Sequence, residues 1–206
     1  MRFLPSSSTT TSVSPPPAYH PLLTAMGRQF EQPLLWLDCE MTGLDPARDR
    51  ILEVACILTD GELKHMQEGP SMVLHCPKEE LEEMGAWCRQ QHGNSGLTEA
   101  CQRATLTARD AEERIIAFLK KNSVGAKEAI LAGNSIHMDK EFLRKEMPAL
   151  LEFLHYRILD VSSIKVIAQR WFPLVAPAKK QYMHRALDDI KESIRELAYY
   201  RERIFK

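Results

Sequence analysis

The sequence has no marked excess of charge of either sign. Its 27 Lys and Arg residues are almost balanced by 28 Asp and Glu residues, so the formal net charge is −1. Non-specific binding to long nucleic acid depends on many Lys and Arg contacts to phosphates, and this balance provides no general attraction of that kind. If the substrate is a nucleic acid, we expect it to be short.

Paired cysteines and long apolar runs are also missing. The five cysteines form no CxxC pair, and their odd number leaves one thiol over in any pairing scheme. This pattern favours free thiols in a reducing compartment over a disulfide scaffold or a zinc knuckle. No stretch reaches the roughly 20 apolar residues needed to span a bilayer, so we expect a soluble protein without a membrane partner.

Acidic residues are absent from the first 30 positions, which are rich in Ser and Thr and contain a Pro triplet. Such a composition buries too little apolar surface to fold, so we predict a disordered tail over residues 1–32 and one folded domain over 33–206. A transit peptide is an alternative, although such segments are usually rich in Arg and this one has only Arg2 and Arg28. A start at Met26 would remove the tail altogether. Cytoplasmic and mitochondrial locations both fit.

After the tail, short β-like runs alternate with helical ones, without an internal repeat. The first three runs predict an antiparallel meander, and two shorter runs later in the chain predict further strands. The predicted strands are Leu34–Met41, Ile51–Thr59, Ser71–Cys76, Ile130–Ala132 and Tyr156–Leu159.

Helical patterns lie between and after these strands. Residues 107–122 carry acids early and lysines late, which suits the helix dipole. Residues 78–104 predict short helices interrupted at Gly93 and Gly96. Further helices are predicted up to Pro148, over Val161–Trp171 and within residues 184–205. A strand meander followed by strand–helix repeats predicts an α/β fold with a mixed β-sheet flanked by helices.

Two acids follow a run of large apolar residues in the segment LLWLDCEM. Successive side chains of a strand point to opposite faces, so Asp38 and Glu40 share one face while Leu37, Cys39 and Met41 line the other. Like charges held this close raise each other's pKa and are costly to keep ionised beside an apolar core. A bound cation would offset that repulsion.

Two later segments place acids near the start of predicted helices. Asp139 lies one turn into the helix that follows Ile130–Ala132, at the carboxyl edge where α/β proteins commonly build sites. Asp188 and Asp189 lie early in the last helix. His184 precedes Asp189 by more than one helical turn, so these two share a face only if His184 lies in the loop before the helix.

These acids suggest a metal site. In this interpretation four carboxylates converge on two hard divalent cations, Mg²⁺ or Mn²⁺, which prefer oxygen ligands. Two such ions about 4 Å apart suit in-line displacement at phosphorus, and an imidazole suits deprotonation of the attacking water. Taken singly, the helix acids also fit solvated charges and the histidine fits a surface residue. The four acids are Asp38, Glu40, Asp139 and Asp189, and the histidine is His184.

Four stretches occur along the chain in a distinctive order: WLDCEMTGLD, GNSIHMDKEFL, YRILDVSSIK and HRALDDIKESIRELAYYR. Together they closely resemble the oligoribonuclease family, in the histidine-containing branch of the DEDD exonuclease superfamily. The resemblance runs from about Leu34 to the C-terminus. It implies a ribonuclease-H-like fold and a 3′-to-5′ exoribonuclease that degrades short single-stranded RNA, especially dinucleotides, to mononucleotides.

The resemblance also implies roles for residues. The metal ligands fall on the four acids above and the general base on His184, while Asp188 caps or supports its helix. Leu44 matches a residue that wedges between two bases, and Trp87 and His92 match a segment that lines the base pocket. A tryptophan in the core is the alternative for Trp87.

A second group of matches concerns the end of the substrate and the oligomeric state. Arg157, Ser162 and Lys165 match a cap over the 5′ phosphate, near a helix start whose N–H groups favour anions, and Ser135 matches a further substrate contact. Tyr156 matches a tyrosine that reaches the active site of the other subunit, which implies a homodimer. A half-buried residue of an edge strand is the alternative for Tyr156.

Two other functions fit the same residues. A DEDD exonuclease acting on longer RNA or single-stranded DNA would share the acids, although the near-neutral charge argues against it. A non-catalytic nucleic-acid-binding module could keep the fold, but a binder would gain by losing buried carboxylates near phosphates. Turnover of a dinucleotide with Mg²⁺ and with a chelator would separate these possibilities.

Overall fold

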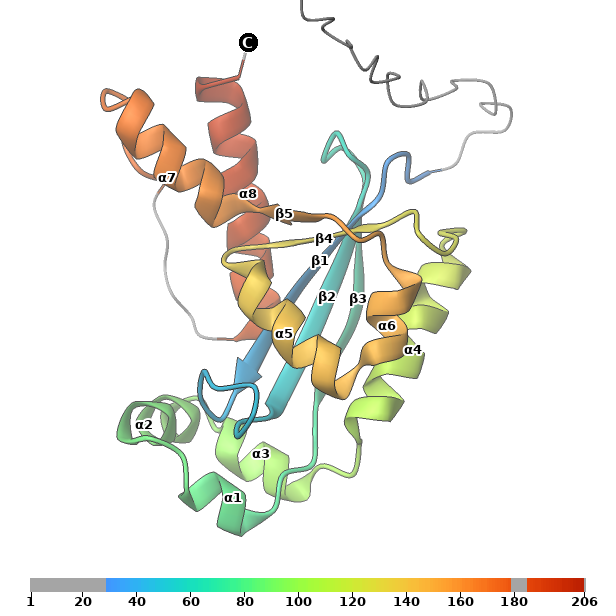
Figure 1. The fold of residues 1–206 in the computed structure, drawn as a ribbon, viewed down its shortest axis with the longest axis vertical. Coiled ribbons are helices and arrows are strands. Elements are labelled where there is room, and N and C mark those ends of the chain that lie inside the picture. Colours follow the sequence, from blue (N-terminus) through green and yellow to red (C-terminus); the bar gives the residue numbers. More distant parts are fainter. Residues whose placement is uncertain (1–28, 179–184, 206) are drawn as a thin grey trace, which may run out of the picture.

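The computed structural model describes residues 29–178 and 185–205 (Figure 1). Residues 1–28 of the predicted tail lie outside the described residues, and so does His184. The account of the fold below concerns the described ranges.

A five-stranded sheet forms the centre of the fold (Figure 1). β1 pairs antiparallel with β2 and β2 with β3, whereas β4 and β5 run parallel to β1. The strands lie in the order β3-β2-β1-β4-β5. This arrangement confirms the predicted α/β fold with a mixed sheet. The bounds are β1 Leu34–Met41, β2 Ile51–Thr59, β3 Met66–Val73, β4 Ile130–Gly133 and β5 Ile158–Asp160.

The third strand differs from the predicted range Ser71–Cys76. β3 spans Met66–Val73 and pairs with β2 almost from end to end. Because it is an edge strand with mostly exposed or half-buried side chains, its first half shows no apolar alternation that would reveal it. Pro70 is tolerated there because an edge strand does not need every backbone N–H for pairing.

Helices cover both faces and one end of the sheet (Figure 1). The helix predicted over residues 107–122 is confirmed by α4. Thr107 and Asp110 close a capping box at its start, with Thr107 N–H donating to Asp110 Oδ2 at 2.8 Å. The bounds are α1 Lys78–Glu82, α2 Ala86–Asn94, α3 Leu97–Arg103, α4 Ala108–Lys121, α5 Ile136–Glu146, α6 Pro148–Phe153, α7 Val161–Trp171 and α8 Ala186–Arg203.

Some helix boundaries differ from the prediction. The predicted break at Gly96 is confirmed, with a φ of +75° that glycine readily adopts, but Gly93 lies within α2 and the other break falls at Gly85. The helix after β4 ends at Glu146. Pro148 begins α6 rather than ending α5, since proline lacks the N–H that the first helical position does not need.

The two faces of the sheet have separate hydrophobic cores. Alternate residues of β1 divide between them: Leu35 and Leu37 pack with α4, α5 and α6, whereas Trp36 packs with residues of α7 and α8. Cys39 belongs to the first core. Asp38 and Glu40 therefore face the α8 side of the sheet, as the alternation predicts.

All five cysteines are free, as predicted, and four of them are buried in the core. A buried thiol behaves there as a small apolar side chain. Among the described helices, none combines the length and the apolar character needed to cross a membrane.

Candidate active site

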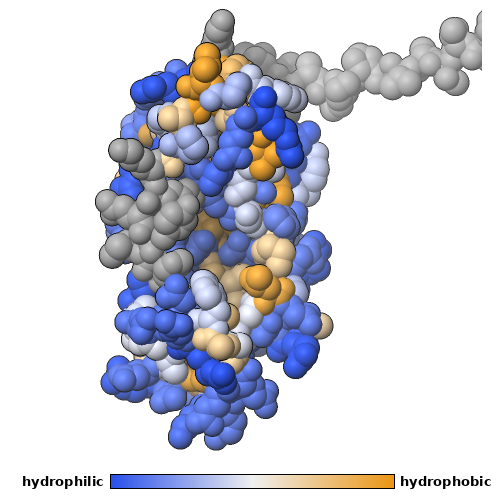
Figure 2. Space-filling view, turned by 90° about the vertical axis from the view of Figure 1, so that its left-hand side faces the viewer, coloured by the Kyte–Doolittle hydropathy of each residue, from blue (hydrophilic) through white to orange (hydrophobic). Residues whose placement is uncertain are grey.

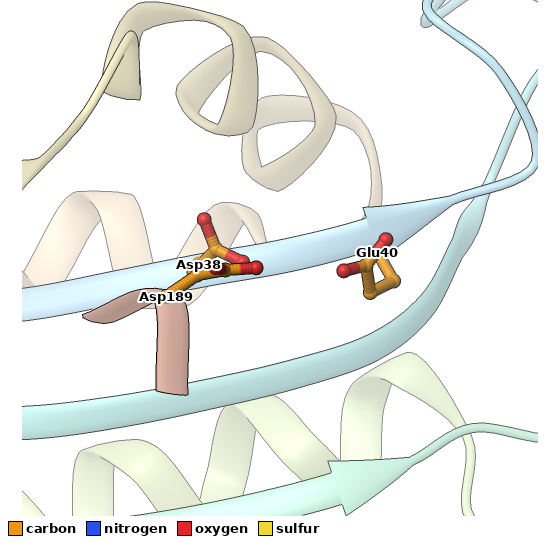
Figure 3. A group of neighbouring side chains, drawn as sticks. All are labelled: Asp38, Glu40 and Asp189. Atoms are coloured by element: carbon orange, nitrogen blue, oxygen red, sulfur yellow. The ribbon is translucent and has the colours of Figure 1, made fainter. Parts of the chain in front are cut away.

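Three carboxylates meet between β1 and the start of α8. Asp38 and Glu40 project from one face of β1, and Asp189 projects toward them from the first turn of α8 (Figure 3). One ligand oxygen from each of the three side chains lies within 4.8 Å of the others. The first strand and the last helix come together because both contribute to the same hydrophobic core.

Asp139 approaches the same region from α5. Its side chain is buried, with 6% exposed, so the alternative of a solvated helix acid is wrong. Its Oδ1 accepts a hydrogen bond from the backbone N–H of Cys39 at 3.0 Å. The structure thus gathers three of the four predicted ligands into one group and places Asp139 close enough to Asp38 to raise its pKa.

Burial and mutual repulsion shift the acids of this site. The pKa of Asp38 is raised well above its ordinary value, first by burial and then by the charges of Asp139 and Glu40. Burial, followed by the charges of Asp189 and Glu53, raises the pKa of Glu40 to about 8. The pKa of Asp139 is also raised, mainly by burial, although the Cys39 N–H opposes the shift.

Glu53 lies beside this cluster and was not predicted as a site residue. It is the one charged residue of β2, is 2% exposed, and stands directly opposite Glu40 in the strand register. Arg185 donates from Nε and Nη2 to its two carboxylate oxygens, at 3.2 and 2.9 Å. β2 is otherwise apolar and pairs with the strand that carries Asp38. A single acid in such a strand is the sequence signal that could have identified Glu53.

His92 links α2 to the end of β1. Its ring is buried, and its Nε2 lies 2.9 Å from the backbone oxygen of Met41. Because a carbonyl oxygen only accepts, Nε2 is the nitrogen that donates. Its Nδ1 lies 3.9 Å from Glu40 Oε2, so the ring faces the carboxylate cluster. Its predicted contact with substrate stays a prediction.

Two apolar side chains with predicted roles at the bases are exposed. Leu44, in the loop after β1, is 74% exposed, and Trp87, in α2, is 62% exposed. The alternative of a core tryptophan for Trp87 is therefore wrong.

The face that carries α7 and α8 above and α2 below is hollowed near its middle, with scattered apolar side chains around the hollow (Figure 2).

Asp160, at the end of β5, organises the predicted phosphate-binding segment. Its Oδ1 accepts hydrogen bonds from the backbone N–H groups of Ser135 and Ser162, each at 2.9 Å. The Ser135 hydroxyl lies 3.1 Å from the Ser162 hydroxyl and donates to it. The Ser162 N–H at the start of α7 is therefore already bonded. An anion at this helix start would therefore not bond that N–H.

Asn134 connects this segment with α8. Its Oδ1 accepts from the Ser162 hydroxyl at 3.2 Å, and its Nδ2 donates to Ser193 Oγ at 2.8 Å and to Glu196 Oε2 at 3.1 Å. Ser193 in turn donates to the backbone oxygen of Asp189 at 2.9 Å. A chain of hydrogen bonds thus runs from the predicted phosphate cap to a predicted metal ligand.

The remaining predicted substrate residues lie around the start of β5 and in α7. Arg157 and Tyr156 are exposed, and the Arg157 guanidinium carbon lies 5.3 Å from the centre of the Tyr156 ring. Tyr156 precedes β5, which begins at Ile158, so the strand predicted over Tyr156–Leu159 is displaced and the half-buried alternative for Tyr156 is wrong. Lys165 is half-buried in α7.

The predicted general base, His184, lies outside the described residues. The described chain resumes at Arg185, which is the N-cap residue of α8. Asp188 is exposed in the first turn of α8, where its charge lies at the positive end of the helix dipole.

The group formed by Asp38, Glu40 and Asp189 fits a hard divalent cation. Its three donors are all carboxylate oxygens, the ligands that Mg²⁺ and Mn²⁺ prefer. Burial and then mutual repulsion raise the pKa values of Asp38 and Glu40, and a bound cation relieves that repulsion. The arrangement can therefore bind divalent metal.

Comparison with known proteins defines the class of this site. Residues 35–197 match the RNase T family model, described as exonuclease. The fold and site are therefore those of an exonuclease. At 49% identity the chain is similar to a probable oligoribonuclease of Schizosaccharomyces pombe, over 84% of this chain and 68% of that protein. It is 46% identical to a mitochondrial oligoribonuclease of Mus musculus, over 88% of this chain and 77% of that protein. The chain belongs to the oligoribonuclease family.

Solved structures share the fold. Exonuclease I from Methylocaldum szegediense superposes with a TM-score of 0.62 at 21% identity, over 84% of this chain and 41% of that one. Escherichia coli exonuclease I, solved with a dT13 oligonucleotide, has a TM-score of 0.63 at 16% identity. The match covers 84% of this chain and 42% of that one. The chain thus spans about two fifths of the length of these enzymes, and the likeness concerns the fold.

We expect the metal-free protein to lose stability as the pH rises. Unfolded Glu40 ionises near its ordinary pKa of 4.5, whereas folded Glu40 keeps its proton up to about 8. Between these values the folded state binds more protons than the unfolded state, so raising the pH destabilises it, by on the order of a few kcal/mol. Thermal unfolding followed by circular dichroism in chelator should show a falling midpoint across this range, and Mg²⁺ should restore most stability at the alkaline end.

Two variants make this measurement specific. Glu40→Gln should flatten the pH dependence, because it removes one of the shifted groups. Glu113→Gln, at an exposed acid on α4, should keep the wild-type dependence. Identical pH profiles for Glu40→Gln and wild type would contradict the assignment.

Proposed function

We infer that the protein is a metal-dependent 3′-to-5′ exoribonuclease that degrades short single-stranded oligoribonucleotides, especially dinucleotides, to mononucleotides. The observation that carries this inference is the carboxylate group of Asp38, Glu40 and Asp189 in a member of the oligoribonuclease family. The names of the relatives support the substrate class. The formal net charge of −1 supports a short substrate.

In this proposal the three grouped acids and Asp139 hold two divalent ions, Mg²⁺ or Mn²⁺. Such ions, when bound, stabilise charge on the scissile phosphate and make water more acidic. The protein holds its ligands in place through neighbouring polar groups: the Cys39 N–H orients Asp139, and the His92 ring faces Glu40. Support of this kind is usual around metal ligands.

His184 is the proposed general base, which accepts a proton from the attacking water. An imidazole suits this role because its ordinary pKa is close to neutral pH. Its place in the sequence supports the role. The next residue, Arg185, is bonded to Glu53, which stands opposite the proposed ligand Glu40.

The ends of the substrate are recognised by groups on either side of the carboxylates. Leu44 and Trp87 are exposed apolar surfaces against which bases can stack, a sequence-tolerant contact. On the other side, Arg157, Lys165 and the hydroxyls of Ser135 and Ser162 bind the 5′ phosphate in this proposal. A cap that bonds a terminal phosphate leaves little room for a longer chain, which gives the preference for dinucleotides a physical basis.

We expect far faster turnover of a 5′-phosphorylated dinucleotide than of a 20-residue RNA of mixed sequence. The difference in kcat/KM should be at least about 100-fold, because the longer chain leaves the polar groups of the cap without their phosphate. Both substrates should be resistant in chelator. Comparable rates on the two RNAs would favour an exonuclease for longer substrates, and no metal-dependent cleavage of either would leave a binding module.

We expect Asp189→Asn to remove cleavage while leaving the fold at least as stable as wild type. The substitution deletes a proposed metal ligand, so kcat should fall by at least about 10³-fold. It also deletes one of several mutually repelling charges, so the unfolding midpoint in chelator should stay or rise. Glu113→Gln is the matched control, with wild-type activity and midpoint. A lower midpoint together with intact cleavage would contradict the assignment.

A homodimer is proposed from the apolar edge formed by α7 and β5. Trp171 is 71% exposed and Leu174 is 99% exposed, and further partly exposed apolar residues accompany them. β5 is an edge strand of the sheet, and α7 follows it directly (Figure 1). A second copy of the chain would cover this surface and bring its exposed Tyr156 toward the partner's site. The accompanying residues are Ile158, Val166, Ile167 and Phe172.

Mixing two inactive variants tests whether Tyr156 acts in the partner's site. Tyr156→Ala and Asp189→Asn, refolded together, form heterodimers in which one site combines an intact Asp189 with the Tyr156 of the other subunit. Random assortment should restore activity to about a quarter of the wild-type level. If Tyr156 acts within its own subunit, mixing restores nothing. Each variant refolded alone is the control.

We also propose the limits of the domain and the location of the protein in the cell. We place the exonuclease domain at residues 33–206, which is supported by the family match over 35–197. Residues 1–32 then precede it as a tail or transit peptide, of which Phe30 packs in the first hydrophobic core. Oligoribonucleases of Mus musculus and Homo sapiens are named mitochondrial, which supports a mitochondrial location here.

A further inference from the structure

Glu53 is a buried acid that the proposed chemistry does not use. It is 2% exposed in the middle of the sheet, opposite Glu40, where an unpaired carboxylate would be costly. Arg185 bonds both of its oxygens, at 3.2 and 2.9 Å, with the two-pronged geometry that only a guanidinium offers. Glu53 and Arg185, called the anchor pair below, thus join β2 to the residue that begins α8.

The backbone of Arg185 carries this connection to Asp189. The Arg185 carbonyl oxygen accepts hydrogen bonds from the N–H groups of Asp188 and Asp189, at 2.9 and 3.0 Å. Arg185, the N-cap residue of α8, makes no side-chain capping bond. Its side chain instead ties the first turn of the helix to the sheet, in addition to the apolar packing of Ala186 and Ile190.

The anchor pair contributes little net charge to the carboxylate cluster. Arg185 lowers the pKa of Glu40 and Glu53 raises it, so the two influences oppose each other. Its main consequence is geometric, because β2 is paired with the strand that carries Asp38 and Glu40. The contact of Arg185 with Glu53 ties the start of α8 to the strand that pairs with β1.

We propose that the Glu53–Arg185 pair is a positioning device that holds Asp189 in register with Asp38 and Glu40 for metal binding. The proposal rests on the metal-ligand roles given under the proposed function. Glu53 and Arg185 are positioning residues here, since they act through Asp189. An ordinary structural ion pair would affect stability alone, whereas a positioning pair affects metal affinity and turnover even when the fold is intact.

Two variants and one control separate these cases. Arg185→Lys keeps the charge but loses the two-pronged contact, because an ammonium is a point donor. The double variant Glu53→Gln with Arg185→Gln removes the buried charge, so that no unpaired carboxylate endangers folding. Lys191→Gln is the control. Lys191 also ties α8 to the sheet, through an ion pair with Glu68 of β3 at 2.7 Å.

Three readouts are compared on the full-length protein. Mn²⁺ binding is measured by calorimetry, kcat and KM are measured on a dinucleotide, and thermal unfolding is followed by circular dichroism. In both anchor variants, Mn²⁺ should bind several-fold more weakly and kcat should fall about 10- to 100-fold, as expected when a ligand is displaced by a fraction of an ångström. KM for the dinucleotide should stay within about twofold. Lys191→Gln should match wild type in metal affinity and kcat.

Other outcomes would overturn the proposal. If Arg185→Lys and the double variant bind Mn²⁺ and turn over like wild type, the anchor pair does not position the site, whatever happens to the unfolding midpoint. If Lys191→Gln loses as much activity as they do, general fastening of α8 is the cause. Failure of the proposed function has a different signature: wild type would then not cleave the dinucleotide, or Asp189→Asn would bind metal and cleave normally.

Discussion

Mutual repulsion among carboxylates held between β1 and α8 is the constraint on which the rest of the site depends. Asp38 and Glu40 share a face because a strand alternates, and that face is covered by the helix that carries Asp189. Burial raises the cost of their charges. The surrounding polar groups do not neutralise the cluster. They orient it, through the Cys39 N–H on Asp139 and the His92 ring beside Glu40.

The parts of this arrangement that follow from local periodicity could be predicted from the sequence. The alternation of β1 predicted the shared face of Asp38 and Glu40, and the acids and lysines of residues 107–122 predicted α4. The start of edge strand β3 was predicted too late, at Ser71, because half of its side chains meet solvent rather than a core. Its limits are set by pairing with β2, which no local pattern records.

Local sequence patterns also do not reveal contacts between residues that lie far apart in the chain. Glu53 matters because of its register opposite Glu40, and Asn134 because one amide reaches both Ser162 and α8. The helix start at Ser162 was expected to offer backbone N–H groups to a phosphate. The Ser162 N–H already donates to Asp160, a contact that the sequence pattern does not reveal.

The pairing of β1 with α8 has a consequence for biosynthesis. The strand that supplies two of the clustered acids is the first of the fold, and the helix that supplies the third is the last. A chain emerging from the ribosome can form most of the sheet before the final helix leaves the exit tunnel. Until α8 has emerged and packed, the nascent chain lacks Asp189 and with it the third carboxylate of the group.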